Sequence, residues 1–302
     1  MTQESLTNAV PCLVIILLIV TEFHYDPEYF RFTPEMKMAF DECGYILVRG
    51  VLSASEVSKV KNAVEISKEI QENAFAIDDG EGGKSRLCIW SHPGNDITGM
   101  VARCEKVAGV SEKLLGGEVY HYHTKLMMKE AHTGGKFVWH QDYGYWYKNG
   151  FLFPNMLTVF MPVDECNRDN GCLQVLRGSH KCGRIEHLFI GGQTGADLER
   201  VEQLKKKLPL EFVEMKPGDG LYFHSNLLHM SSPNKSPNRR WAFLVAYSRA
   251  DNDAVYEHHL PFCTPVHEVP NTAVIDCDDV DMSGKGFMDP TRDKTIKRER
   301  DS

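Results

Sequence analysis

A histidine and an aspartate stand one residue apart in the aromatic stretch FVWHQDYGYWY, residues 137–147. In a β-strand, residues i and i+2 point to the same side, so this spacing predicts that His140 and Asp142 direct an imidazole and a carboxylate toward one point. A carboxylate buried among aromatic rings without a partner is destabilising, and a divalent cation removes that cost. The pair therefore predicts part of a metal site.

A third ligand and an anion-binding cation are predicted in residues 217–247, which we interpret as a turn, a strand that ends at His229, a loop and a strand that begins at Arg240. Two histidines and one carboxylate form the facial triad of non-haem Fe(II) oxygenases, which leaves positions for a co-substrate and oxygen. A 2-oxoacid that chelates iron has a distal carboxylate, which a guanidinium binds through two parallel hydrogen bonds. Arg240 is the predicted anchor, and Arg239 is the alternative because spacing does not separate neighbours.

The elements that must position these residues differ on the two sides of Gly117. Before it, N-cap, capping-box and glycine signals predict helices. After it, short runs of Val, Leu, Phe, Tyr and Trp alternate with Gly/Pro-rich turns, which is typical of an antiparallel sandwich or barrel. The sequence thus predicts a mainly β fold with flanking helices and an N-terminal helical layer. The predicted helices are 33–43, 53–70, 96–116 and 195–208, and a strand is predicted at 45–52.

Four motifs carry a family resemblance: WHQD (139–142), DNGCLQVLRGSH (169–180), KPGDGLYFHSNLLH (216–229) and Arg240. Together they resemble the phytanoyl-CoA dioxygenase family of Fe(II)/2-oxoglutarate oxygenases, and they are also similar to the related ectoine hydroxylases. The resemblance covers residues 33–250. It implies a double-stranded β-helix, which is a jelly-roll, cupin-like fold.

The resemblance also implies a reaction and a set of roles. His140, Asp142 and His229 would be the catalytic residues that ligate Fe(II), with 2-oxoglutarate and O2 as co-substrates and ascorbate as an optional addition. The enzyme would hydroxylate an unactivated carbon of a small molecule and release succinate and CO2. The alternative is a non-catalytic metal-binding cupin-like sensor or interaction protein. The positions that match the family's co-substrate pocket are Arg240, Lys125, Met127, Thr158 and Gln141.

The aromatic residues that follow the H-x-D motif have two interpretations. Tyr143 or Trp146 is expected to border the substrate, because this segment directly follows the ligands. Plain packing explains the other rings, and an aromatic cage for a quaternary ammonium is the alternative. The substrate itself stays open among an acyl-CoA, an amino acid, an amine and a natural product.

The remaining histidines are interpreted as supporting residues. His121 and His123 alternate on a predicted strand, where ordinary strand positions are favoured over a second metal pair. His224 is expected in a turn or beside the metal ligands. His258 and His259 lie beyond the strand pattern and are expected at the surface.

Composition limits the partners and the compartment. The chain has 302 residues and a formal net charge of -8, which argues against nucleic acid as a partner. The 9 cysteines contain no CxxC pair, and their odd number favours reduced thiols in the cytoplasm. The apolar run at 10–20 is too short to span a bilayer. It also lacks a basic n-region, so secretion is only an alternative.

The predicted domain organisation is simple. Residues 1–32 form an N-terminal extension, 33–265 form a single oxygenase domain whose jelly-roll core covers 118–250, and 266–302 form a C-terminal tail. A small-molecule substrate is the expected partner, and the sequence leaves the oligomeric state open.

Overall fold

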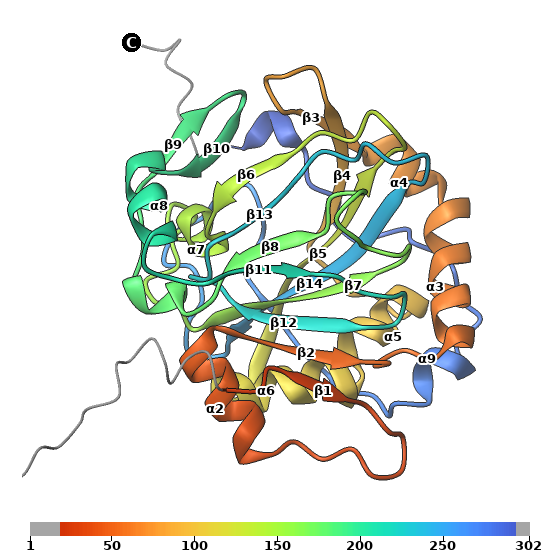
Figure 1. The fold of residues 1–302 in the computed structure, drawn as a ribbon. Coiled ribbons are helices and arrows are strands. Elements are labelled where there is room, and N and C mark those ends of the chain that lie inside the picture. Colours follow the sequence, from red (N-terminus) through yellow and green to blue (C-terminus); the bar gives the residue numbers. More distant parts are fainter. Residues whose placement is uncertain (1–18, 294–302) are drawn as a thin grey trace, which may run out of the picture.

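A large sheet dominates the computed structural model, which describes residues 19–293. Strand β1 pairs with β2 in parallel, and the other neighbours pair antiparallel (Figure 1). In sheet order the strands are β1 (Glu22–His24), β2 (Tyr45–Arg49), β12 (Gly220–His224), β7 (Met156–Pro162), β14 (Arg240–Arg249), β5 (Val119–Lys129), β4 (Lys84–Trp90) and β3 (Phe75–Asp78), with β15 (Thr264–Pro265) on β5.

A smaller sheet packs against one face of the large one. Its strands, in order, are β11 (Leu210–Val213), β8 (Leu173–Leu176), β13 (His229–Ser231) and β6 (Phe137–His140). The apolar layer between the sheets includes Phe160, Phe223 and Leu244 from the large sheet and Leu173 and Val175 from the small one. This arrangement confirms the predicted mainly β, jelly-roll fold. A separate hairpin consists of β9 (His187–Ile190) and β10 (Gln193–Ala196).

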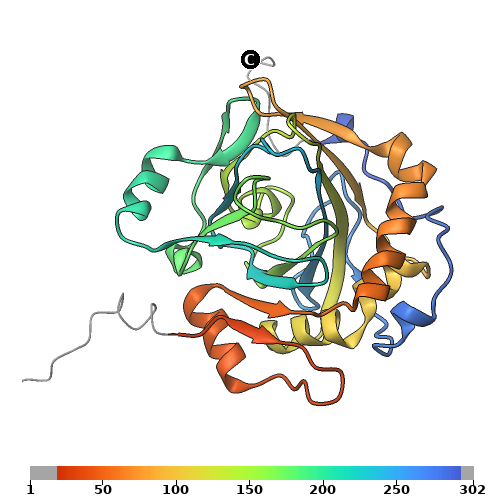
Figure 2. The ribbon, with the colours of Figure 1, turned by 45° about the vertical axis from the view of Figure 1, so that its right-hand side comes forward.

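Helices cover the outer face of the large sheet. Figure 2 shows the N-terminal helices on the side opposite to the small sheet, and a second apolar cluster fills the layer beneath them. The helices are α2 (Pro34–Cys43), α3 (Ala54–Ile66), α4 (Lys68–Asn73), α5 (Ile97–Arg103), the π-helix η1 (Glu105–Gly109), α6 (Val110–Leu115), α7 (Asp142–Trp146), α8 (Leu198–Lys205) and α9 (Ala273–Asp276), with 3-10 turns η2 (Ser179–Cys182) and η3 (Pro290–Arg292).

Capping residues set the ends of the N-terminal helices as the sequence predicts. Thr33 caps α2 by accepting a hydrogen bond from the Met36 amide, and Gly44 ends that helix with φ 86°, a conformation that favours glycine. Ser53 and Glu56 form the predicted capping box of α3. The helix predicted over 53–70 is interrupted, however, because Ser67 adopts an extended backbone and caps α4 with its own hydroxyl.

Segments near both ends of the described chain pack against the large sheet. Strand β1 lies within the predicted extension 1–32, and Phe287, within the predicted tail, forms a β-bridge with Trp90. The domain limits remain a prediction. Most of the apolar run at 10–20 lies outside the described residues. Within 19–293, no helix combines the length and apolar character needed to cross a bilayer.

Candidate active site

Three buried side chains converge at the small sheet. His140, Asp142 and His229 each offer a ligand atom, and these atoms all lie within 4.8 Å of one another. The Asp142 Oδ1 atom is 3.9 Å from the Nε2 atom of His140 and 3.9 Å from that of His229. The three residues predicted from the sequence therefore come together with spacing that suits one shared cation.

Hydrogen bonds orient both imidazoles toward that point. His140 Nδ1 lies 2.7 Å from the Val138 carbonyl oxygen, and His229 Nδ1 lies 2.9 Å from the Leu227 carbonyl oxygen. A carbonyl only accepts, so each Nδ1 carries the proton and each Nε2 presents a lone pair. Two imidazoles and one carboxylate are a donor set that fits Fe(II) with open positions, so these residues fit the predicted metal.

Two local predictions about these residues are wrong. His140 ends β6, and Asp142 begins α7 instead of continuing a strand. The chain turns because the Tyr143 amide donates to the Ser225 carbonyl and starts a helical turn. His229 begins β13 instead of ending a strand, since β12 stops at His224. The two histidines meet because they are register partners across β6 and β13.

The charge state of the triad follows from burial and its neighbours. Burial lowers the pKa of His140 well below its usual value, and the neighbouring His229 adds to this, so the imidazole stays neutral. Burial raises the pKa of Asp142. The nearby Lys125 and the two histidines outweigh this effect, so the pKa falls to about 2. The Thr158 hydroxyl donates to Asp142 Oδ2 at 2.6 Å. The carboxylate is therefore ionised, and its Oδ1 atom faces the histidines.

A cavity of about 370 Å³ opens beside the triad. Lys125 and Met127, two of the predicted co-substrate residues, line it together with His140 and Asp142. Most of its wall is apolar or aromatic, which is typical of small-molecule sites. The segments that contribute to the wall are β3, β4, β5, β6, α7, the β9–β10 hairpin and residues 259–293.

A narrow recess of about 10 Å³ continues between the sheets. It shares Lys125, Met127, Phe137 and His140 with the cavity and is also lined by His229 and Ser231. The recess therefore runs from the triad into the space between the two sheets.

Arg240 lies in the interior close to this recess. It is fully buried, and its guanidinium stands 5.7 Å from the ring of Phe160, which lines the recess. One terminal nitrogen donates to the Gly171 carbonyl at 2.6 Å, whereas the buried Nε has no partner among the described residues. Arg239 instead pairs with Asp164 and Glu65 and is partly exposed. Of the two arginines, Arg240 is the one near the recess.

The other predicted site residues take different positions. The Thr158 hydroxyl contacts Asp142, a candidate metal ligand, directly. Gln141 is not brought into the cavity, because its amide is fully engaged by the Gly183 and Asn226 carbonyls and the Ile185 amide. It joins the two ligand-bearing segments to the 183–185 loop. Of the two aromatic candidates, Trp146 lines the cavity, whereas the Tyr143 hydroxyl donates to the Phe151 carbonyl.

The remaining histidines divide into buried and cavity-lining groups. His121 is buried and bonds to Thr124 and Ser91, so it has a packing role. His123 lines the cavity, and its buried Nδ1 has no hydrogen-bond partner in the part of the chain that the structure describes. The surface prediction for His259 is wrong: its side chain lines the cavity and pairs with Asp293 at 3.4 Å. Residues 250–293 fold back over the sheet, which sequence spacing does not show.

Comparison with known proteins agrees with this geometry. A family model described as phytanoyl-CoA dioxygenase (PhyH) matches residues 40–242. An L-proline trans-4-hydroxylase of Streptomyces griseoviridis is 28% identical over 253 residues, which cover 78% of this chain and 94% of that protein. An ectoine dioxygenase of Stutzerimonas stutzeri is 25% identical over 258 residues, which cover 80% of this chain and 83% of that protein.

The family match covers more than half of the chain. The chain belongs to the phytanoyl-CoA dioxygenase family. The crystal structure of EctD from S. alaskensis with 2-oxoglutarate and 5-hydroxyectoine has a TM-score of 0.63 at 24% identity, covering 76% of this chain and 83% of that one, and it supports the fold. Family and triad together confirm the predicted function class, an Fe(II)- and 2-oxoglutarate-dependent dioxygenase.

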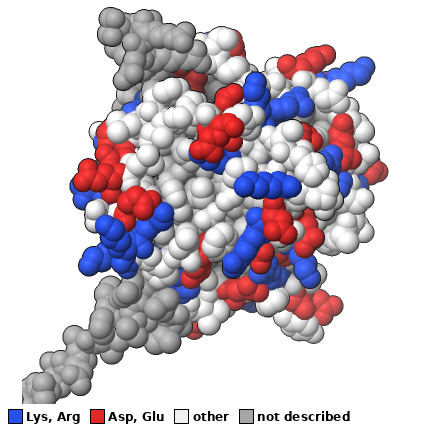
Figure 3. All heavy atoms as spheres, turned by 45° about the horizontal axis from the view of Figure 1, so that its top comes forward, with Lys and Arg blue, Asp and Glu red and all other residues white. Residues whose placement is uncertain are grey.

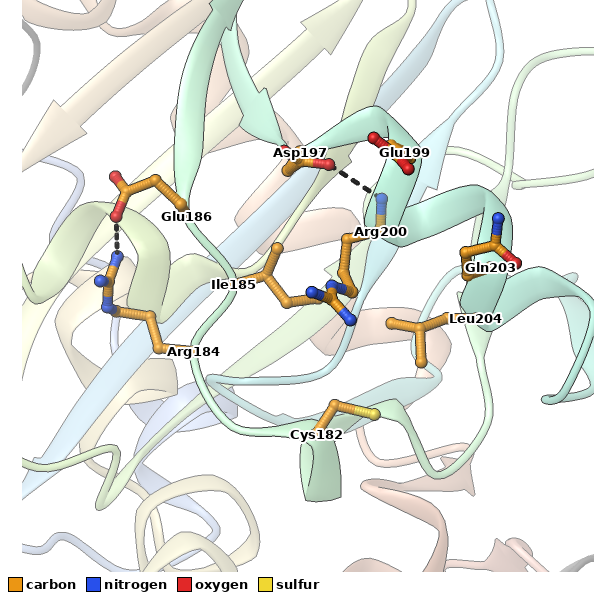
Figure 4. Close-up of a pocket in the computed structure, with 9 residues that line it drawn as sticks. All are labelled: Cys182, Arg184, Ile185, Glu186, Asp197, Glu199, Arg200, Gln203 and Leu204. Atoms are coloured by element: carbon orange, nitrogen blue, oxygen red, sulfur yellow. Dashed lines mark hydrogen bonds and ion pairs between the residues drawn. The ribbon is translucent and has the colours of Figure 1, made fainter.

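Not every hollow of this family member belongs to the active site. A surface hollow of about 650 Å³ lies between the 182–186 segment and α8 (Figure 4). Three of its charged side chains have local partners: Arg184 pairs with Glu186, and Asp197 caps α8 by accepting from the Arg200 backbone amide. None of the predicted site residues lines it. The candidate active site is therefore the cavity beside the triad and not this surface hollow.

Proposed function

We propose that this dioxygenase hydroxylates a small amino acid, with His140, Asp142 and His229 as the iron ligands and Arg240 as the anchor of 2-oxoglutarate. The observation that carries the roles is the buried triad, whose ligand atoms lie within 4.8 Å of one another. Iron bound there would activate O2 at the expense of 2-oxoglutarate, which yields succinate, CO2 and a hydroxylated product.

The protein groups contribute positioning and exclusion of water. The Val138 and Leu227 carbonyls keep the Nε2 lone pairs of the histidines directed at the metal position. The Thr158 hydroxyl holds Asp142 so that Oδ1 faces the same point. The apolar walls limit the access of water to the reacting atoms.

Three observations support an amino-acid substrate. The relatives named above act, by their names, on L-proline and ectoine, which are small ring compounds with a carboxylate. The cavity of about 370 Å³ suits a small molecule beside the co-substrate. His123 and Lys125 line it, and the buried Nδ1 atom of His123 has no hydrogen-bond partner within residues 19–293. These two side chains would bind the polar group of the substrate.

Charge on the surface agrees with a small-molecule substrate. On the face in Figure 3, basic and acidic side chains are interspersed with neutral ones. Among the described residues visible on that face, the basic side chains do not form a continuous stripe of the kind that nucleic-acid-binding proteins use.

The test is a turnover assay with Fe(II), 2-oxoglutarate, ascorbate and O2. A panel contains L-proline, other small amino acids, ectoine and an acyl-CoA. We expect succinate release to rise with an amino acid, and that amino acid to gain the mass of one oxygen atom. His229→Ala is the matched control and should release no succinate above background. Stimulation by the acyl-CoA alone would contradict the substrate class, and no 2-oxoglutarate turnover with any compound would contradict the reaction.

A further inference from the structure

The cavity beside the triad has two further charged side chains in its wall. Outside the triad, the described residues that line it include one lysine or arginine, Lys125, and one carboxylate, Asp293. The rest of the wall is apolar, aromatic, neutral polar or histidine. A charge in a largely apolar wall favours a ligand group of opposite sign, because that group loses hydration when it enters. The cavity therefore suits a ligand that carries both an anionic and a cationic group.

The basic part of the wall lies on strand β5. His123 and Lys125 are two residues apart in this strand, and both side chains line the cavity. The buried Nδ1 atom of His123 has no hydrogen-bond partner within residues 19–293. An ammonium and an imidazole N–H are donors from which a carboxylate accepts. This part of the wall therefore suits the carboxylate of an amino acid.

The acidic part of the wall lies on the returning segment 259–293. His259 and Asp293 both line the cavity, and His259 Nδ1 is 3.4 Å from Asp293 Oδ1. Burial lowers the pKa of His259, and Asp293 opposes this only in part, so the imidazole is neutral at neutral pH. A carboxylate has two oxygens that accept about four hydrogen bonds, so the contact with His259 is compatible with a cationic partner as well.

Backbone hydrogen bonds hold the part of the chain that carries Asp293. The Met288 amide donates to the Ile89 carbonyl of β4 at 2.8 Å. Asp289 then caps the 3-10 turn η3, and Asp293 is the residue that follows this turn as its C-cap. A short, ordered connection thus joins Asp293 to the large sheet. A group held in place before binding loses little entropy when a ligand arrives, which suits it to discriminate between ligands.

We propose that Asp293 is a specificity-determining residue, which binds the ammonium group of the amino-acid substrate while the substrate carboxylate lies toward Lys125. This inference rests on the proposed function and deepens it, because it requires a substrate whose amine is free and cationic. A carboxylic acid without the amine would leave Asp293 without that partner and would be a poorer substrate.

The test compares two amino acids with acids of similar shape in which the amine is absent. L-Proline is paired with cyclopentanecarboxylate, and L-leucine is paired with 4-methylpentanoate. The kcat/KM for succinate release is measured with Fe(II), saturating 2-oxoglutarate and O2 on the wild type, Asp293→Asn and Glu257→Gln. Asn keeps the shape of Asp without its charge. Glu257 is an exposed carboxylate on the segment that leads to His259 and does not line the cavity, so it is the matched control.

The wild type should prefer an amino acid over its amine-free counterpart by about tenfold or more. Asp293→Asn should lower kcat/KM for that amino acid by about tenfold to a hundredfold, mainly through KM, and change kcat/KM for the counterpart by less than about twofold. Only the charge-assisted hydrogen bond to the ammonium is removed. Glu257→Gln should match the wild type. The Asp293 side chain is 39% exposed, so we expect Asp293→Asn to fold, and thermal unfolding checks this.

A loss of equal size for both members of a pair, or no loss for the amino acid, overturns the role of Asp293. A wild type that uses the amine-free acids as well as the amino acids overturns it too, whatever the variants do. The proposed function fails separately: if neither amino acid supports succinate release by the wild type, the substrate class falls, and this inference falls with it. A preference of the wild type that persists unchanged in Asp293→Asn removes only the role of Asp293.

Discussion

At the scale of single residues, the neighbouring arginines offer a direct test of the co-substrate anchor. Arg240 is buried near the recess, whereas Arg239 is partly exposed and pairs with Glu65 and Asp164. Arg240→Met should raise KM for 2-oxoglutarate on the order of a hundredfold, since it removes charge-assisted hydrogen bonds to the distal carboxylate. Arg239→Met is the matched control and should leave this KM nearly unchanged. The opposite ranking in steady-state kinetics would make Arg239 the anchor.

Thr158 offers a second test, because its hydroxyl donates to Asp142 Oδ2 at 2.6 Å. Thr158→Val keeps the shape of the side chain and removes that bond. We expect metal affinity to fall about tenfold to a hundredfold, as for other groups that orient metal ligands. Competition with a chelating dye measures this affinity. If KM for 2-oxoglutarate rose instead and metal affinity stayed constant, Thr158 would belong to the co-substrate pocket, as the sequence motif predicts.

Residue types and spacing predicted the groups with the most specific chemistry. The triad needs two imidazoles and a carboxylate, and the chain places them in recognisable motifs around His140 and His229. Residue type and spacing did not predict which way the side chains of Gln141, His123 and His259 face. Whether a side chain faces the cavity or a backbone carbonyl depends on turns and returning segments that have no fixed spacing. Ser231 lies two residues after His229 in β13, a spacing that predicts the same side of the strand, and it lines the recess.

At the scale of elements, α7 connects a packing contact to the metal site. A Cβ atom at Gly144 would lie 2.1 Å from the His187 ring. Gly144→Ala must therefore displace α7 or the His187 ring, and Asp142 is the first residue of that helix. We expect the free energy of unfolding to fall by about 1–3 kcal/mol. Metal affinity should fall as well, because the carboxylate moves with the helix.

Gly117→Ala is the matched control for this variant. Its Cβ would meet only the flexible side chain of Arg249, at 3.3 Å. Chemical denaturation and metal titration are measured on both variants. Equal metal affinity in Gly144→Ala and the wild type would show that α7 yields without moving Asp142.

Element prediction succeeded where a local signal exists. Thr33, Ser53 and Gly44 act at helix ends through their own side chain or backbone conformation, so the sequence alone shows them. The prediction for the H-x-D segment was wrong. A spacing of two residues predicts a strand that continues through Asp142, whereas α7 begins there. The contact that stops the strand comes from Ser225, which is distant in sequence. Tertiary hydrogen bonds of this kind have no local signature.

At the scale of the whole molecule, distant segments complete the site. The cavity wall combines β3, the β9–β10 hairpin and residues 259–293 with the central strands. The sequence predicted the fold class from the number of short strands and turns, and the family motifs predicted the jelly roll. The strand order and the return of residues 259–293 depend on long-range packing, which a single sequence does not show.

The buried histidines of the large sheet predict how the whole fold responds to acid. His121 is fully buried, and its Nδ1–H donates to the Ser91 carbonyl, so its Nε2 accepts from the Thr124 hydroxyl. Burial, followed by the nearby Lys285 and His92, lowers the pKa of His121 to about 3. Its ordinary value is 6.5. Between these values the unfolded chain binds the proton and the native protein does not.

The contribution of the neutral, buried His121 to the free energy of unfolding is therefore fully present above about pH 6.5. It is lost as the pH falls toward 3, at about 1.4 kcal/mol per pH unit. From pH 7 to pH 5 we expect this group to remove about 2 kcal/mol from the free energy of unfolding. Urea denaturation at both values measures the change in the wild type and in His121→Gln. Gln does not titrate, so the variant should be less stable at pH 7 but lose less stability in acid. Equal losses in both proteins would show that His121 remains neutral in the unfolded chain or becomes protonated in the native fold without cost.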